Sequence, residues 1–152
     1  QFTKALPANV GVLVTADHGI VDVPTERHIY VDEFPLEGLI SVGGDPRVLF
    51  LYFDQSQEVS PRQQIIEGLQ AFVGKRAIVA SRNQVVEAGW YGPVSEEAIS
   101  RMPEIFLIAH GETALYHREF AKPKSLKMIG QHGAISDDEL FVPLLKFGAY
   151  QK

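Results

Sequence analysis

Apolar residues in this chain come in short runs that are separated by turn-forming residues, which predicts strands alternating with helices. The first run, Val10 to Thr15, lies between Pro7-Ala-Asn9 and Asp17-His-Gly19. A continuous run of this kind is typical of a strand buried on both faces of a parallel sheet. The shorter run His28 to Val31 also has a strand pattern.

Two pairs of apolar runs predict strands that lie side by side. Leu39 to Val42 and Arg47 to Phe53 flank Gly43-Gly-Asp-Pro46, a loop of turn formers, so we expect a β-hairpin. Ile105 to Ala109 and Thr113 to His117 form a similar pair across His110-Gly-Glu112. A single short strand is expected at 77–80.

The helix signals are strongest after Ser60-Pro61, where Ser is a good N-cap and Pro fits the first helical position. Apolar residues then recur on one helical face as far as Phe72, and Gly74 is a suitable end. Shorter helices are expected at 81–88, 95–100 and 136–139, and 118–134 is expected to be irregular. Together the elements predict an α/β fold, or α+β, with a mixed sheet and flanking helices.

Composition narrows the chemistry. The 152 residues carry 14 Lys and Arg against 19 Asp and Glu, a net charge of −5, and 45% of them are hydrophobic, as in globular proteins. A chain of this length buries about 70% of its unfolded surface, so it needs no metal merely to hold a core. It has no Cys, which excludes thiol nucleophiles, Cys-ligated zinc and disulfides. Any transition-metal site must therefore use His and carboxylate ligands.

No stretch predicts a membrane anchor or a signal peptide. The longest apolar run, Val48 to Phe53, is far shorter than the ~20 residues that span a bilayer. The chain begins at Gln1 and reaches a strand-like run within ten residues, which favours a fragment of a longer protein. The location of that protein stays open, with the cytoplasm favoured.

Asp17-His18-Gly19 follows the first expected strand, at the sheet edge where α/β proteins bind ligands. Carboxylate and neutral imidazole are both zinc ligands, and Gly19 would let the backbone turn so that both side chains face one ion. The simpler alternative is a turn in which Asp17 caps the next element and His18 is exposed. The tripeptide alone favours that alternative.

A second candidate is Gly130-Gln-His-Gly133, where glycines on both sides of His132 allow close approach of backbone to a ligand. A loop His is also commonly just solvated, so this motif alone decides nothing.

Together the motifs resemble the Ser/Thr-x-Asp-His-Gly strand end and the Gly-x-His-Gly loop of the alkaline phosphatase superfamily, in its nucleotide pyrophosphatase/phosphodiesterase branch. The resemblance continues between them. Gly43-Gly-Asp-Pro-Arg47 is similar to the small-sheet region of that branch, and Met102-Pro-Glu-Ile-Phe-Leu-Ile-Ala109-His-Gly111 is similar to its Pro-Asp segment.

The resemblance implies two divalent ions, usually zinc, that serve phosphoryl transfer through a Thr or Ser nucleophile. By position, Asp17 and His18 would bind the ion that activates the nucleophile, and His132 would bind the other. The implied substrates are nucleotides or other phosphodiesters, hydrolysed at phosphodiester or pyrophosphate bonds. No cofactor beyond the two metal ions is implied.

The chain departs from the family pattern upstream of Asp17. The nucleophile, a strand-end Asp and an Asp-x-x-x-His pair would precede this position, but the sixteen residues there contain no carboxylate or His, and Thr3 lies in no matching motif. Zinc takes about four ligands, so three cannot serve two ions. We therefore expect residues 1–152 to be the C-terminal part of the enzyme domain, with a small-sheet subdomain at about 38–118, no catalytic residue of its own and no activity alone.

That truncation would expose apolar surface along Val10 to Val14 and so favour self-association. Other residues have simpler interpretations. His28, His110 and His117 lie outside the matched motifs, and Trp90-Tyr91-Gly92 is more typical of a packing anchor than of a base-stacking platform. Acidic residues at 137–139 fit a helix start better than a cation site. The basic stretch consists of Arg118, Lys122, Lys124 and Lys127. It attracts phosphate or is simply solvated, and it is no nucleic-acid signature.

The competing hypothesis is a self-contained α/β binding or regulatory domain, in which Asp17, His18 and His132 are incidental. Within the hydrolases, phosphomonoesterase and sulfatase siblings also remain open. Geometry separates the metal-dependent hydrolase from the binding domain, because a metal site requires His132 to lie within a few ångströms of the Asp17-His18 pair.

Overall fold

The computed structural model describes residues 2–54 and 60–151, which form ten strands and four α-helices. The strands are β1 (Gly11–Val14), β2 (Val21–Asp22), β3 (His28–Tyr30), β4 (Leu39–Asp45), β5 (Val48–Phe53), β6 (Ala77–Ser81), β7 (Ile105–Ala109), β8 (Ala114–Tyr116), β9 (Gly130–Gln131) and β10 (Leu145–Gly148). The helices are α1 (Ser60–Val73), α2 (Arg82–Glu87), α3 (Glu96–Arg101) and α4 (Asp137–Leu140). Short 3-10 turns connect several of them.

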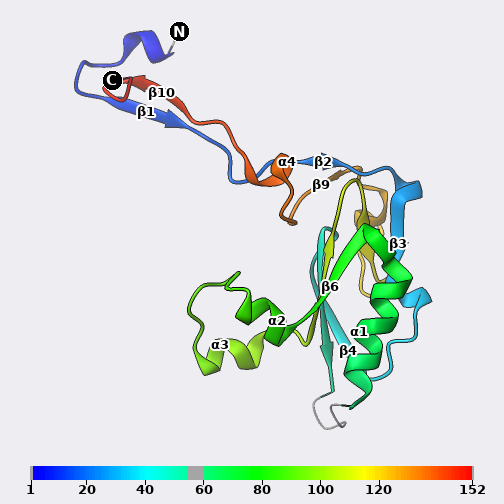
Figure 1. The fold of residues 1–152 in the computed structure, drawn as a ribbon. Helices are drawn as coiled ribbons and strands as arrows, with labels where there is room; N and C mark the ends of the chain where they lie inside the picture. The colour runs from blue at the N-terminus through cyan, green and yellow to red at the C-terminus, as the bar shows by residue number, and fades with distance from the viewer. Residues whose placement is uncertain (1, 55–59, 152) are drawn as a thin grey trace.

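The body of the molecule is a four-stranded sheet in the order β4-β5-β7-β6, in which every neighbouring pair is antiparallel (Figure 1). The expected hairpin of β4 and β5 is confirmed, but β4 extends through Gly44 to Asp45, so only Pro46 and Arg47 form the turn. Gly44 allows this tight turn because its φ is +81° and a Cβ there would lie 2.2 Å from the Val48 carbonyl oxygen.

Alternation along β5 divides the core between the two faces of this sheet. Leu49, Leu51 and Phe53 pack with the apolar face of α1, which lies across one side (Figure 1). On the other face, Phe106 and Ile108 of β7 form a smaller cluster with members of α2 and of the loop after β9. The second cluster brings the segment that follows His132 onto the sheet.

The helices begin and end where the sequence predicts. The main helix α1 starts at Ser60 and stops before Gly74, whose φ of +61° ends it. Ser81 caps α2 in a reciprocal capping box with Gln84, and Ser95 caps α3 through the Ala98 N–H. These local signals were sufficient because capping involves residues only three positions apart.

The expected pairing of 105–109 with 113–117 is wrong. Strand β7 lies between β5 and β6, while β8 pairs in parallel with β3, 86 residues earlier in the chain at His28 and Ala114. Arg47 holds the segment between β7 and β8, since its guanidinium donates to the carbonyls of Gly111 and Thr113. The connection is thereby tied to the turn of the β4–β5 hairpin rather than free to form its own.

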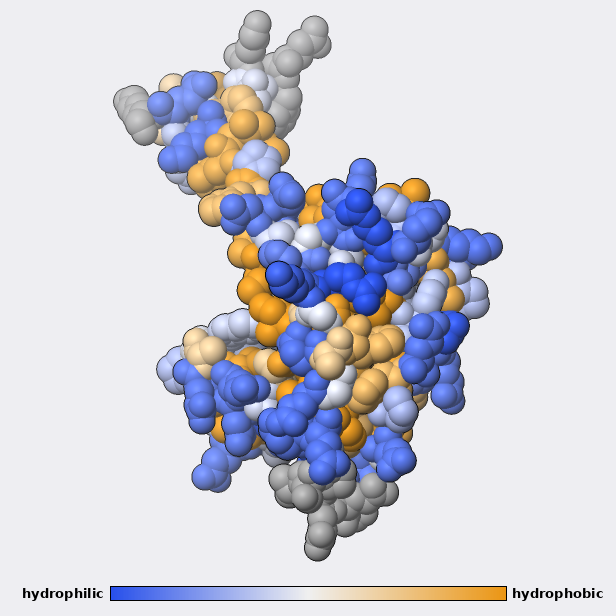
Figure 2. Space-filling view, turned by 45° about the vertical axis from the view of Figure 1, so that its right-hand side comes forward, coloured by the Kyte–Doolittle hydropathy of each residue, from blue (hydrophilic) through white to orange (hydrophobic). Residues whose placement is uncertain are grey.

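The expectation of a first strand buried on both faces of a parallel sheet is also wrong. Strand β1 forms a two-stranded antiparallel ribbon with β10, and this ribbon projects from the body (Figure 1). Leu13 and Val14 are 52% and 47% exposed. Apolar residues gather on the projecting part in Figure 2. The exposure agrees with the apolar edge that truncation was expected to leave, whereas self-association stays a prediction.

Two short elements join the ribbon to the body. Strands β2 and β9 pair antiparallel, and α4 lies between the ribbon and this pair (Figure 1). The fold class is α/β, as expected, but parallel pairing occurs in the separate β3–β8 sheet and not within the four-stranded sheet. The subdomain proposed at about 38–118 contains the whole four-stranded sheet. No helix in the described part of the chain is long and apolar enough to cross a membrane.

Candidate metal centre

The residues singled out at the first motif lie just after the ribbon, in the loop between β1 and β2. The Asp17 side chain is 90% exposed and the His18 side chain 36%. His18 Nε2 lies 3.8 Å from the Asp17 carboxylate. The two side chains of the motif therefore face one another, as binding to a common ion would require.

His132, from the second motif, lies directly against His18. The two imidazole rings are stacked with their centroids 3.7 Å apart and their planes 14° from parallel. More than a hundred residues separate them in the sequence, and the β2–β9 pairing brings their loops together. The fold thus places both sequence motifs at one point.

Hydrogen bonding defines which nitrogen of His18 is free. Its Nδ1 lies 2.7 Å from the Gly19 carbonyl oxygen, which can only accept, so Nδ1 carries the proton and donates. In a neutral His18 ring the lone pair is then on Nε2, the nitrogen that faces Asp17. Metal-bound histidines commonly donate their other N–H to a backbone carbonyl in this way.

Stacking also limits how the two histidines could bind metal. A ring nitrogen binds an ion in the plane of its ring, at about 2.0–2.1 Å for zinc. Parallel planes with centroids 3.7 Å apart do not converge on one such point. His18 and His132 could therefore serve two different ions but not share one.

The donor set is incomplete within residues 2–54 and 60–151. No group of three or more His, Cys, Asp or Glu in these ranges is arranged to hold a metal ion. Asp17 and His18 fit one part of a zinc site and His132 fits part of another, since both ligand types suit zinc. Further ligands would have to come from elsewhere.

A buried ion pair that the sequence analysis did not identify lies beneath the two motifs. Arg47, at the β4–β5 turn, is fully buried, and its Nε and Nη2 donate to the two carboxylate oxygens of Glu139 at 3.0 and 2.9 Å. Glu139 does lie in the first turn of α4, as expected of a helix-start acid, but the sequence did not predict that it would be buried. Its side chain is 2% exposed and points into the body.

Several donors keep the Glu139 carboxylate charged. Burial alone would raise its pKa, but hydrogen bonds from Arg47, Ser136 and the Ala134 N–H, together with the charge of Arg47, lower the pKa from 4.5 to about 2. The Ala134 N–H bond measures 2.9 Å. This carboxylate is an acceptor with all of its capacity used, not a metal ligand.

The remaining histidines are not part of the candidate site. His28 is buried against Tyr116, with ring centroids 4.8 Å apart, and burial lowers its pKa. Neither of its ring nitrogens has a partner with hydrogen-bond geometry, although the Val23 backbone lies near. His110 is exposed, and His117 packs edge-on against Phe120.

The basic stretch divides into two parts. Arg118 forms ion pairs with Asp32 and Glu33 and lies over the Tyr30 ring, 4.8 Å from its centroid. The three lysines of the stretch, Lys122, Lys124 and Lys127, are exposed. Arg118 is thus committed to structure, and the lysines have the solvated character expected of them.

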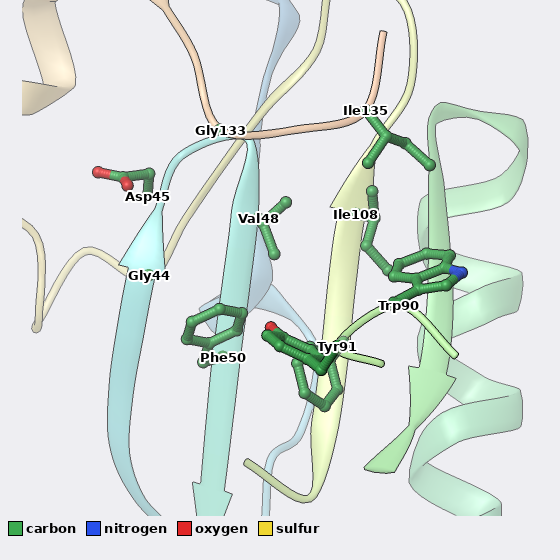
Figure 3. A pocket seen from close by; sticks show the side chains of 10 residues that line it. Gly44, Asp45, Val48, Phe50, Trp90, Tyr91, Ile108, Gly133 and Ile135 are labelled. Carbon is green, nitrogen blue, oxygen red and sulfur yellow. The ribbon is translucent and has the colours of Figure 1, made fainter. Parts of the chain in front are cut away.

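A cavity of about 480 Å³ lies beside the candidate site, on the sheet face opposite α1 (Figure 3). Its wall includes Trp90, Tyr91 and Phe50, and Gly133 lines its edge. Trp90 and Tyr91 are about half exposed, and the Tyr91 ring lies 6.3 Å from Phe106. Neither His18 nor His132 lines this cavity, so it is a separate aromatic surface and not the metal centre.

Comparisons with known proteins agree with this architecture. The family model described as type I phosphodiesterase / nucleotide pyrophosphatase matches residues 1–135. No curated protein sequence matches the chain significantly. Human ectonucleotide pyrophosphatase/phosphodiesterase 5 has a similar structure, with a TM-score of 0.69 and 18% identity, over 92% of this chain and 34% of that one.

Two further structures are similar. Murine ectonucleotide pyrophosphatase/phosphodiesterase 5 has a TM-score of 0.69 at 17% identity, over 92% of this chain and 34% of its own. Phosphonoacetate hydrolase from Sinorhizobium meliloti has a TM-score of 0.58 at 17% identity, over 91% and 36%. At these identities the likeness shows the fold, and the chain spans about a third of each solved relative.

The family assignment rests on the family model, which covers most of the chain and both histidine motifs. The solved structures add that the same fold occurs in phosphodiesterase and phosphonate-hydrolase members. This chain belongs to the type I phosphodiesterase/nucleotide pyrophosphatase family of the alkaline phosphatase superfamily.

Proposed function

We propose that the chain contributes Asp17 and His18 to one divalent ion and His132 to a second, in a hydrolase of phosphodiester or nucleotide pyrophosphate bonds. The observation that supports this most is the stacking of His18 on His132, 3.7 Å between centroids. Ions of two-metal hydrolases lie about 3.5–4 Å apart. Two stacked imidazoles with one ion each suit that separation.

The chain's own groups would have distinct tasks. Asp17 would contribute negative charge and a hard oxygen ligand, and His18 would bind through Nε2 while its Nδ1–H stays on the Gly19 carbonyl. His132 would bind the second ion through a nitrogen of its own ring. When bound, two zinc ions supply Lewis-acid stabilisation of the attacking and leaving oxygens.

The nucleophile, a Thr or Ser, and the other ligands would lie in parts of the protein outside this chain. That proposal follows from the donor count, because zinc takes about four ligands and the described residues hold no group of three. It also agrees with the span of this chain, 34% of the human relative. The chain alone would then lack the reacting group.

A nucleotide-like substrate is the first choice. The murine relative has been solved, as an inactive variant, in complex with AMP. A phosphodiester between a nucleoside and a good leaving group is the corresponding test substrate. The substrate's negative charge would be met by the bound ions, since Arg118 of the basic stretch is already paired with Asp32.

Turnover of a 4-nitrophenyl nucleoside phosphodiester tests the proposal. The product of the full open reading frame that contains this chain should hydrolyse it in a zinc-dependent way. His18→Ala and His132→Ala should each lower kcat/KM by more than about 100-fold, the upper loss typical of residues that merely support a metal ligand. The isolated chain should give negligible turnover even with zinc.

His110→Ala is the matched control, because His110 is exposed and outside the site. It should leave kcat/KM unchanged. Zinc-dependent turnover by the isolated chain would contradict the proposal that the missing groups are required. Equal losses in all three His variants would contradict the assignment of His18 and His132.

One observation favours the alternative of a binding or regulatory domain, namely the lack of a three-donor group among the residues described. Under that alternative no phosphoester would be hydrolysed by the full-length product. Hydrolysis of other substrate classes also needs a test, since the fold occurs in phosphonoacetate hydrolase. A phosphomonoester, a sulfate ester and phosphonoacetate would be assayed in parallel, and the preferred substrate would assign the branch.

A further inference from the structure

Helix α4 lies at the junction of the ribbon and the body, next to the loops that carry both histidines (Figure 1). The backbone of α4 holds the loop that carries His18. The Gly19 N–H donates to the Glu139 carbonyl at 2.8 Å, directly after His18 in the chain. The position of His18 is thus tied to α4.

The contact at Gly19 leaves no room for a side chain. A Cβ at this position would lie 1.8 Å from the Asp138 carbonyl oxygen. Real Cβ atoms do not approach backbone oxygens so closely, which explains why glycine follows the Asp17-His18 pair. The close approach fixes the distance between this loop and α4.

The side chain of the same Glu139 holds the second loop. Its Oε1 accepts from the Ala134 N–H at 2.9 Å, two residues beyond His132. Gly133 packs next to Asp45 at the hairpin turn, where a Cβ would lie 3.3 Å from the Asp45 Cβ. Glu139 therefore accepts a backbone hydrogen bond from each of the two loops that carry the stacked rings.

Arg47 anchors this residue to the sheet. Its guanidinium makes the bidentate pair with Glu139, and its Nη1 donates to the Gly111 and Thr113 carbonyls. The guanidinium is fully buried and its planar fork matches a carboxylate in one orientation only. The carboxylate thus has a fixed place relative to the body.

We propose that Glu139, anchored by Arg47, is the positioning residue that sets the distance between His18 and His132, and with it the separation of the two metal ions. The inference rests on the proposed function for the role of the two histidines. It adds that α4 is a shared support for both halves of the metal centre. A displacement of about 1 Å at a reacting centre can cost about 100-fold in rate, so such a support matters.

The test compares Glu139→Gln with Glu104→Gln in the isolated chain. Glu104 is a matched control, because it is buried, pairs with Arg82 at 2.7 Å and accepts a backbone N–H from Phe53 at 2.9 Å. It directly precedes β7 and hydrogen-bonds to Leu51 and Phe53 of β5, not to either histidine loop. Both substitutions keep side-chain volume and remove one buried charge from an Arg partner.

Nuclear magnetic resonance of zinc-free samples reports the outcome. Nuclear Overhauser effects (NOEs) between the His18 and His132 rings should be present in the wild type and in Glu104→Gln. Glu139→Gln should lose them and shift both sets of ring signals. Retention of the inter-ring effects in Glu139→Gln would overturn the proposal. Their loss in both variants would also overturn it, because general destabilisation would then suffice.

A measurement on the wild type covers the case in which Glu139→Gln does not fold. The Gly19 and Ala134 amides, which both close on Glu139, should exchange with solvent slowly and with similar protection factors. Protection factors that differ by 100-fold or more would overturn the shared support. Zinc titration of the full-length product is a separate arm. If the His18 and His132 ring signals do not change when zinc is added to the full-length product, the proposed function fails while the positioning result stands.

Discussion

At the level of single residues, Glu139 has an environment far from that of a free side chain. It is a carboxylate with 2% of its side chain exposed, and its whole acceptor capacity is used by the Arg47 fork, Ser136 and the Ala134 N–H. Buried ion pairs contribute little net stability, but removing one partner typically costs about 3–5 kcal/mol. Loss of the Glu139 carboxylate would therefore leave the buried Arg47 guanidinium without its ionic partner.

The lowered pKa of Glu139 predicts a defined pH dependence of stability. Its pKa falls from 4.5 in the unfolded chain to about 2 in the fold, so its stabilisation is complete above about pH 4.5 and is lost as the pH falls toward 2. The stabilisation is on the order of 3 kcal/mol. Urea unfolding of the wild type and Glu139→Gln at a series of pH values measures it.

The difference in unfolding free energy between these two proteins should be largest near neutral pH and should shrink through the acidic range. Gln does not titrate, so the variant provides the baseline. A difference that stays constant down to about pH 2 would show that the carboxylate does not lose its partners on protonation, contrary to the lowered pKa.

The sequence predicted that the motif residues would lie together, but it did not identify the residues that support them. Asp17, His18 and His132 sit in short motifs with glycine neighbours, and the structure brings them together. Arg47 and Glu139 lie 92 residues apart, and no local pattern links them. The spacing of Ser136 and Glu139 predicts a helix start, which is correct, but the same two side chains bond to each other in the interior.

Among the elements, the ribbon of β1 and β10 projects from the body (Figure 1). A two-stranded ribbon in water is marginally stable, and this one exposes Leu13, Val14 and Leu145 on its surface. Exposed apolar strand edges pair with other chains. We therefore expect the isolated chain to associate through this ribbon.

Leu13→Lys should weaken that association, because a Lys on an exposed strand disfavours edge pairing. The concentration at which half of the chain is associated should rise by about tenfold, for the loss of on the order of 1.4 kcal/mol of contact energy. Sedimentation velocity over a concentration series measures it. Ile78→Lys, at an exposed position of edge strand β6, is the control.

If Ile78→Lys rather than Leu13→Lys shifts the series, the contact lies on the four-stranded sheet and the expectation for the ribbon is wrong.

Elements were predicted correctly where the contacts that decide them join residues close in the sequence. The caps of α2 and α3 and the β4–β5 hairpin depend on neighbours in sequence. The pairing of β8 with β3 joins residues distant in the sequence and was missed.

At the scale of the whole molecule, the chain is a sheet-based body with a projecting ribbon, and the candidate metal centre lies where they join (Figure 1). It has the fold of its family over 34% of the length of a solved relative. We propose that His18 and His132 serve two ions, one each, in a metal-dependent hydrolase. Stacked rings that cannot share an ion are its physical basis.

Anomalous diffraction at the zinc edge, from crystals of the full-length product grown with zinc, tests this claim most directly. We expect two anomalous zinc peaks about 3.5–4 Å apart, one bonded to His18 and Asp17 and the other to His132. A single peak bonded to both histidines, or no peak within bonding distance of either, would contradict it.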